Sequence, residues 1–128
     1  MGLFSSLKKQ NTGVPRSSLA WLEDAEEVYT RAYHTTNLQG CEKYFSRDVY
    51  RTISEEIRRN GKTYSGLTRY RHTSWEMKTQ GVYLRIITYD QMQISKGIQA
   101  KVGEDFTEEW TLGETNEGTK IVKIRRVS

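Results

Sequence analysis

The stretch FTEEWTLGETNEGTKIVKIRR (residues 106–126) contains two apolar runs separated by a polar segment with two glycines. This pattern predicts an antiparallel hairpin with a loop over about 113–119. Successive side chains of a strand point to opposite faces, so Glu108 shares its face with Phe106 and Trp110. Because that face is the more apolar of the two, Glu108 is expected to point toward the core.

Two interpretations of Glu108 stay open. A carboxyl group between aromatic side chains can act as a general base when burial raises its pKa. Alternatively, the hairpin register places Glu108 opposite Ile124, with Arg126 one step away, and a diagonal Glu108–Arg126 pair at the rim would be structural. The sequence offers no inward histidine and no second inward acid nearby to complete an acid–base pair.

The apolar residues upstream of this hairpin repeat with a helical period. Residues 18–36 predict an amphipathic helix with Ser18 as its cap, and a shorter helix is expected over about 38–45. Ser46 and the Asn60-Gly61 pair then mark the start and the stop of another helix. Its core face is predicted from residues that recur every four positions: Val49, Ile53 and Ile57.

The period changes to two after Gly66. Strands are predicted over 68–79 and 82–95, with a turn at Gln80-Gly81 between them. Residues 94–102 alternate more weakly, which leaves open a strand end or a loop. Helices therefore come first and an antiparallel sheet comes last, and this order predicts an α+β fold with the helices packed on one face of the sheet.

Composition limits the classes of function. The chain has 128 residues and a net charge of +4, which suits one domain with a mildly basic surface. Cys41, the single cysteine, is expected in the core, and the two histidines lie far apart, so no metal site and no cofactor is predicted. No signal peptide or transmembrane segment is recognisable, which makes a cytoplasmic location the expectation.

Residues 1–16 read as a flexible basic tail, and residues 17–128 as the domain. The pattern M-G-x-x-x-S, with Gly2 and Ser6, also fits a site for N-terminal myristoylation. The tail predicts a weak, peripheral contact with an anionic membrane surface through apolar side chains at helical spacing followed by two lysines: Leu3, Phe4, Leu7, Lys8 and Lys9.

A second candidate site comes from large side chains on the expected inner faces of helix and sheet. Binding pockets are mainly apolar with a few polar groups, but a packed core would use the same side chains. Both interpretations stay open for the candidate pocket-lining residues, which are Tyr29, Tyr33, Trp75, Met77, Glu108 and Trp110.

Three stretches resemble the Tim44-like branch of the NTF2-like (cystatin-like) superfamily: AYHTTNLQGCEKYFSRDVYRTISEEI (32–57), GVYLRIITYDQMQIS (81–95) and the hairpin of residues 106–126. Together they span about residues 18–127. The chain departs from the common pattern in its last strand, where Lys120-Ile121 stands in the place of a tryptophan. The resemblance implies helices laid in the concave face of a curved, mostly antiparallel four-stranded sheet. It implies no catalytic residue that could be transferred.

The expected function is therefore a non-enzymatic binding module, associated with a membrane surface or with protein transport. Its predicted partners are a hydrophobic small molecule, a lipid or a protein, and the resemblance implies a homodimer through the sheet. The alternative is a small isomerase, dehydratase or hydrolase of the same fold, with Glu108 as acid or base and a tyrosine as donor. Nucleic-acid binding is not predicted, because the basic and aromatic residues of TRYRHTSW (68–75) alternate between two faces.

Overall fold

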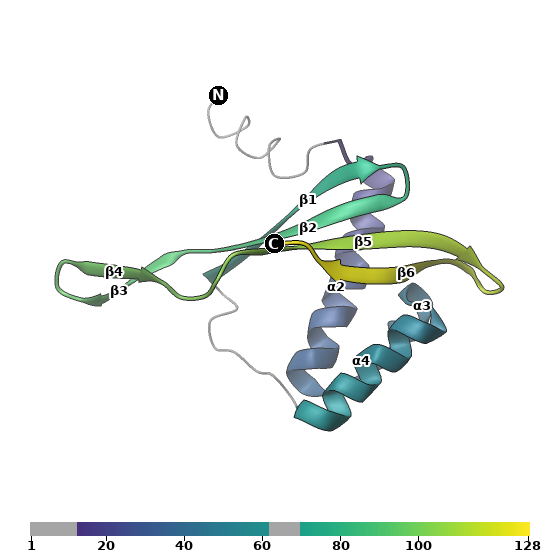
Figure 1. Ribbon diagram of the computed structural model, residues 1–128, viewed down its shortest axis with the longest axis horizontal. Helices are drawn as coiled ribbons and strands as arrows, with labels where there is room; N and C mark the ends of the chain where they lie inside the picture. Colours follow the sequence, from purple (N-terminus) through teal and green to yellow (C-terminus); the bar gives the residue numbers. More distant parts are fainter. Residues whose placement is uncertain (1–12, 62–69) are drawn as a thin grey trace.

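The computed structural model describes residues 13–61 and 70–128. Within them the chain forms α2 (Arg16–Thr35), α3 (Cys41–Tyr44), α4 (Arg47–Asn60), β1 (Arg71–Thr79), β2 (Val82–Tyr89), β3 (Gln91–Ser95), β4 (Ile98–Lys101), β5 (Phe106–Thr115) and β6 (Gly118–Arg126). Four strands make an open antiparallel sheet in the order β1-β2-β5-β6, and the helices lie on one side of it (Figure 1). The predicted α+β fold is confirmed. None of the described helices is long and apolar enough to cross a membrane.

Helix α2 begins two residues before the predicted start. Pro15 occupies the N-cap position, and no side chain caps the helix, so the prediction of Ser18 as the cap is wrong. The backbone NH of Leu19 donates to the carbonyl of Pro15 at 2.8 Å, which places Ser18 inside the first turn. Pro15 has φ −58° and ψ 146°, so it lies just outside the helix while its carbonyl accepts the first hydrogen bond of α2.

Helix α4 has the predicted boundaries. The backbone NH of Val49 donates to Ser46 Oγ at 3.3 Å, and the NH of Gly61 donates to the carbonyl of Ile57 at 2.8 Å. Gly61 has a φ of 70°, a value that glycine adopts without strain. The predicted core face is confirmed, because Val49, Ile53 and Ile57 are all buried.

The register of the β5–β6 hairpin differs from the prediction. The strands extend to Thr115 and Gly118, so the turn is much shorter than residues 113–119, and the pairing shifts at a bulge next to Thr111. Trp110 therefore lies opposite Ile124, and Glu108 lies opposite Arg126. A bulge adds one residue to one strand, and the sequence carried no signal of it.

The segment between α3 and α4 is tied to the edge of the sheet. Phe45 forms a parallel bridge with Ile121, and the backbone NH of Ser46 donates to the Ile121 carbonyl at 3.0 Å. The ammonium group of Lys120 donates to the carbonyls of Glu42 and Lys43 in α3, at 2.7 Å and 2.9 Å. These contacts fix where α4 starts relative to β6.

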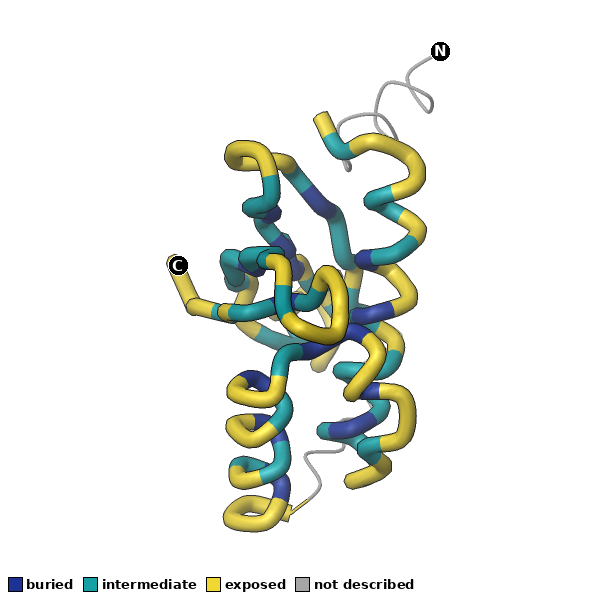
Figure 2. Tube along the Cα trace, turned by 90° about the vertical axis from the view of Figure 1, so that its right-hand side faces the viewer, coloured by how far each residue is buried: buried dark blue, intermediate teal, exposed yellow. Residues whose placement is uncertain are grey.

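Aromatic rings fill the space between the helices and the sheet. The ring of Trp110 lies 5.2 Å from that of Tyr29, 5.8 Å from that of Phe45 and 5.3 Å from that of Trp75, measured between centroids. Cys41 is fully buried beside them, as predicted. Figure 2 shows the buried positions of the helices on the sides that face each other and the sheet. The interior is thus a packed core.

The opposite face of the sheet carries the other glutamate of the FTEEWTL strand. Glu109 lies beside Leu84 of the neighbouring strand and is held by Lys78 from β1 and Arg125 from β6. The Lys78 ammonium lies 2.9 Å from its carboxylate. Hydrogen bonds from Lys78 and Arg125 lower the pKa of Glu109 to about 2. Adjacent glutamates therefore serve opposite faces, as the alternation predicts.

Residues 94–102, predicted as a strand end or a loop, belong to a second hairpin. Strands β3 and β4 pair with each other in a separate two-stranded sheet. The predicted strand over 82–95 is correspondingly interrupted at Asp90. This hairpin projects from the end of the four-stranded sheet, beyond the helices (Figure 1). It is called the β3–β4 arm below.

We predict that replacing Ser46 with alanine lowers the free energy of unfolding by about 1 kcal/mol, because the first turn of α4 loses its only side-chain acceptor. The matched control is Ser18→Ala, which removes no capping bond and leaves the stability of the protein unchanged. Urea unfolding followed by circular dichroism measures both variants. Equal losses in the two variants would contradict the assignment of the caps.

The lowered pKa of Glu109 predicts a dependence of stability on pH. The folded-state pKa lies below the ordinary value of 4.5, so the ion pairs stabilise the protein above about pH 4.5 and are lost toward pH 2. Over this window Glu109→Gln should lose less stability than the wild type. The exposed Glu104, which has no ion pair within the described part of the chain, provides the control Glu104→Gln. Parallel pH profiles for the wild type and Glu109→Gln would disprove this role.

Candidate functional site

A cleft of about 430 Å³ opens between α2, α4 and the strands β5 and β6. Its walls combine aliphatic side chains, two tyrosine rings and charged groups of both signs. The lining residues are Tyr29, Tyr33, Asp48, Val49, Thr52, Ile53, Glu56, Glu108, Val122, Lys123, Ile124 and Arg126. We refer to it as the α2–α4 cleft.

The six candidate pocket residues separate into three groups. Tyr29, Tyr33 and Glu108 line the α2–α4 cleft. Trp75 and Trp110 are almost fully buried in the core and do not line it. Met77 also lies outside the lining and is 40% exposed on β1. The structure therefore brings together the tyrosines and the glutamate, with the tryptophans packed as core.

Arg85 of β2 is the most buried charged residue in the described part of the chain. Its side chain is 3% exposed and forms ion pairs with Glu26 of α2 and Glu108 of β5. The Arg85 Nη1 atom donates to Glu108 Oε1 at 2.8 Å, and Nε donates to Glu26. The guanidinium also lies 5.6 Å from the ring centroid of Tyr29 and 5.7 Å from that of Trp110. Burial alone lowers the pKa of Arg85, but the two carboxylates outweigh it and raise that pKa.

The same arrangement restricts Glu108. Its Oε1 atom accepts a second hydrogen bond, from Trp110 Nε1 at 3.1 Å. The structural interpretation expected Arg126 as the diagonal partner, but Arg126 lies directly opposite Glu108 and the ion pair of Glu108 is with Arg85. Arg126 instead places its guanidinium 4.2 Å from the centroid of the Phe106 ring. One oxygen of Glu108 is thus committed to the structure of the core.

A tyrosine–glutamate pair provides the polar group on the helical side of the cleft. Tyr33 Oη donates to Glu56 Oε2 at 2.7 Å, and the rings of Tyr29 and Tyr33 meet edge to face with centroids 5.0 Å apart. Burial raises the pKa of Tyr29, and the negative charge of Glu108 is the second-largest cause of this increase. Burial also raises the pKa of Tyr33, and the neighbouring Tyr29 is the second-largest cause. Both phenols are therefore protonated donors at neutral pH.

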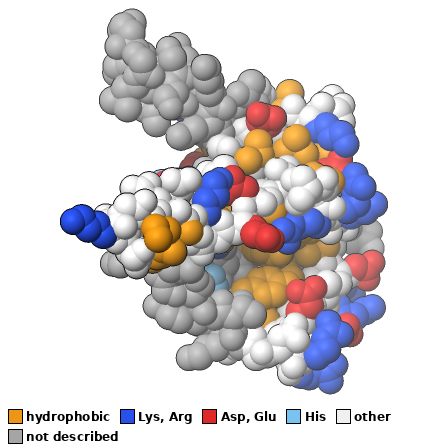
Figure 3. All heavy atoms as spheres, turned by 60° about the vertical axis from the view of Figure 1, so that its left-hand side comes forward, with side chains coloured by type: hydrophobic (Ala, Val, Ile, Leu, Met, Phe, Trp, Pro, Cys, Tyr) orange, Lys and Arg blue, Asp and Glu red, His pale blue; other side chains and the backbone are white. Residues whose placement is uncertain are grey.

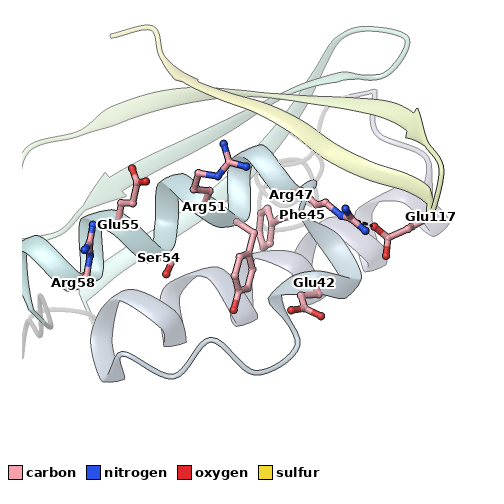
Figure 4. Close-up of a pocket in the computed structure, with 9 residues that line it drawn as sticks. Glu42, Phe45, Arg47, Arg51, Ser54, Glu55, Arg58 and Glu117 are labelled. Carbon is pink, nitrogen blue, oxygen red and sulfur yellow. Dashed lines mark hydrogen bonds and ion pairs between the residues drawn. The ribbon is translucent and has the colours of Figure 1, made fainter.

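A larger hollow of about 560 Å³ lies along the arginine-bearing side of α4 (Figure 4). Arg47 Nε lies 3.3 Å from Glu117 Oε1 of the β5–β6 turn, and the side chains of this pair are 87% and 60% exposed. Three arginines and three glutamates line the hollow, so their formal charges cancel. Because these side chains are mostly at the surface and their charges favour neither an anion nor a cation, we assign no ligand to this hollow.

Other predicted features fall outside these sites. Leu3, Phe4, Leu7, Lys8 and Lys9 lie in the part of the chain that the structure does not describe. In residues 13–61 and 70–128, no group of three or more histidine, cysteine, aspartate or glutamate side chains is arranged to hold a metal ion. The polar groups that line the α2–α4 cleft include two phenols, from Tyr29 and Tyr33, and the carboxylates of Glu56 and Glu108.

Sequence reasoning missed Glu56, which lines the cleft, and also Arg85 and Glu26, which form the ion-pair network that holds Glu108. A partial signal existed for Arg85, because period two places it on the same strand face as Tyr83 and Ile87, both of which are buried. A charged residue on such a face needs a buried partner of opposite charge. The sequence did not indicate which of the acids of residues 18–36 would supply it.

Comparisons with protein families, with curated proteins and with solved structures found no match for this chain. The assignment to the Tim44-like branch therefore stays a prediction from the sequence. The candidate site has to be judged from its own geometry.

We predict that Arg85→Met lowers the free energy of unfolding by about 3 kcal/mol, since it leaves Glu26 and Glu108 without their cation. Replacing both glutamates with glutamine in the same chain should restore at least half of the loss, because the unpaired charges are removed. Chemical denaturation of the three proteins provides the measurement.

The control is Arg125→Met, which breaks the ion pair of Arg125 with Glu109 on the outer face of the sheet. Arg125 is itself about half exposed, and Lys78 remains as a partner of Glu109, so this variant should lose clearly less stability than Arg85→Met. If both arginine variants lost the same amount, the buried network would have no special place in the stability of the fold.

Proposed function

We propose that this protein is a non-catalytic binding module that holds a small amphipathic ligand in the α2–α4 cleft. The proposal depends on one observation: apolar side chains and fixed hydrogen-bonding groups line the same cleft above a packed core. The partly buried Val122 and Ile124 offer apolar contact, and the paired Tyr33 and Glu56 offer a polar end. Such a mixture is typical of sites that bind a small molecule in one orientation.

The size of the cleft supports a ligand with a short aliphatic or single-ring body. Lys123 and Arg126 lie among the lining residues from β6, and Asp48 and Glu56 among those from α4. A cationic head group would be attracted to the α4 side, and an anionic head group to the β6 side. We therefore treat the sign of the head group as the property that the first experiment determines.

The second candidate function is an enzyme of the same fold, and one observation favours it. Glu108 lines the cleft together with Tyr29 and Tyr33, so a carboxylate and two protonated phenols share one space. Against this function, Glu108 Oε1 already accepts hydrogen bonds from Arg85 and Trp110. A general base must be able to reach and accept a proton, and these two donors stabilise the carboxylate in its present place. We consequently favour binding over catalysis.

The resemblance to Tim44-like domains supports a wider setting for this binding module, at a membrane surface or in protein transport. It also supports a homodimer through the outer face of the sheet, where Val82, Leu84 and Ile86 of β2 are only partly buried. A lipid or a protein segment with an apolar side chain and one polar end would satisfy the same cleft. These partners remain part of the proposal.

The cleft can be tested with decanoate and decylamine, which share an aliphatic body and differ in the sign of the head group. We expect the wild type to bind one of them, as measured by titration calorimetry. Thr52→Trp places a large ring among the lining residues, so it should weaken this binding about tenfold, equivalent to about 1.4 kcal/mol.

The matched control is Thr35→Trp. Thr35 and Thr52 both lie on helices and donate to the carbonyl four residues earlier, but Thr35 does not line the cleft. Absence of binding to both probes, or equal weakening by both variants, would contradict the proposed site. A bound molecule recovered chemically unchanged supports a binding module. Conversion of that molecule by the wild type but not by Glu108→Gln would establish the enzyme instead.

A further inference from the structure

The β3–β4 arm is held away from the rest of the molecule by contacts at its base. The backbone NH of Asp90 donates to the carbonyl of Tyr70 at 3.0 Å, and the NH of Val102 donates to the carbonyl of Asp90 at 3.2 Å. Asp105 Oδ1 accepts from the NH of Tyr89 at 3.0 Å, on the adjoining strand. These contacts tie the two ends of the arm to the four-stranded sheet, so its direction is set by β2 and β5.

The tip of this arm exposes two large aliphatic side chains. Ile94 is 62% exposed and Ile98 is 54% exposed, the highest values for large hydrophobic residues in the described part of the chain. They flank the turn at Lys96 and Gly97. In Figure 3, where the arm comes forward, its projecting part carries an orange hydrophobic patch, and a blue basic side chain lies at its outer end. Exposed apolar side chains that lie close together can mark a contact with a protein or a membrane.

Charge is distributed unevenly along the arm. Residues 91–101 contain two lysines and no acid, whereas Asp90, Glu104 and Asp105 lie at the base. Lys101 is paired with Asp105, so the charge near the base is partly neutralised. Lys96 at the tip forms no ion pair with any residue that the structure describes. The apolar tip is therefore accompanied by an uncompensated positive charge, and negative charge is kept away from it.

We propose that the tip of the β3–β4 arm is a membrane-contact site that inserts Ile94 and Ile98 into the interfacial region of an anionic lipid bilayer. Aliphatic side chains gain from leaving water at the acyl boundary, and a neighbouring lysine gains from the anionic head groups. The long stem of Lys96 allows its ammonium group to stay at the head-group level while the isoleucines lie deeper. Two isoleucines make a weak and reversible contact.

This occupant fits the arm better than a protein does. Residues 91–101 contain two lysines and no acid, which matches a surface of uniform negative charge. The contact is independent of ligand binding in the α2–α4 cleft, since no residue of the arm lines that cleft. It is also separate from the predicted tail site at Leu3, Phe4 and Leu7.

The test is flotation of the full chain with vesicles made of equal parts of phosphatidylglycerol and phosphatidylcholine. The double variant Ile94→Ser, Ile98→Ser should lower the partition coefficient by about tenfold or more, because two aliphatic side chains are lost from the contact. Lys96→Gln should lower it by about fivefold, as expected for one lysine at an anionic surface. Wild-type binding to pure phosphatidylcholine vesicles should be weaker than to the anionic ones by a similar factor.

The matched control is Met77→Ser, since Met77 is an exposed hydrophobic residue on the body of the sheet. A second control carries Leu3→Ser, Phe4→Ser and Leu7→Ser in the full chain and measures the contribution of the tail. The proposal is overturned if the wild type does not float, if only the tail variant loses binding, or if Met77→Ser loses as much as the arm variant. It is also overturned if sedimentation shows that the arm variants dissociate a dimer, because the arm would then contact a second copy of the chain. Decanoate or decylamine binding in the arm variants should match the wild type, which separates this site from the cleft.

Discussion

The ion pairs of Arg85 are the constraint on which the rest of the structure depends. A guanidinium can be buried under a sheet only when carboxylates accompany it, and here one comes from α2 and one from β5. Glu26 therefore fixes the longest helix over β2, and Glu108 fixes the neighbouring strand. Trp110 donates to the same oxygen of Glu108, so the central tryptophan is oriented by this network as well. These directional ion pairs act together with the close packing of α2 side chains against the core.

The position of the cleft is a consequence of how the interior is filled. Trp75, Trp110 and Phe45 occupy the space between the sheet and the helices, so no room for a ligand is left at the centre. The α2–α4 cleft lies beside this packed interior, and Tyr29 and Tyr33 form part of its wall. A ligand in this place would touch the aromatic core from the side while one of its ends stayed in water. This geometry suits recognition of a polar end better than complete enclosure of an apolar molecule.

Periodicity predicted most of the fold, because each main element has one buried face. It placed Val49, Ile53 and Ile57 on the core side of α4, and it separated Glu108 from Glu109 correctly. Periodicity gave no clear prediction where neither face of a strand is buried. For this reason the residues of the β3–β4 arm were predicted only as a strand end or a loop. Spacing along one chain also cannot reveal a bulge, which explains the wrong partner for Ile124. The ion-pair partners of Arg85 could not be predicted for a similar reason. Periodicity shows which face of a strand a residue lies on, but it does not show which residue of a distant helix or strand will meet it.

The bridge between Phe45 and Ile121 has a consequence for the behaviour of the protein in concentrated solution. Strand β6 is an edge of the sheet, and an unpaired edge offers its backbone groups to a strand of another molecule. Here the NH of Ser46 already occupies the carbonyl of Ile121, and the chain that leads into α4 covers this part of the edge. The segment that leads into α4 thus protects this part of the edge strand, so a strand of another molecule cannot pair with it and extend the sheet into a fibril here.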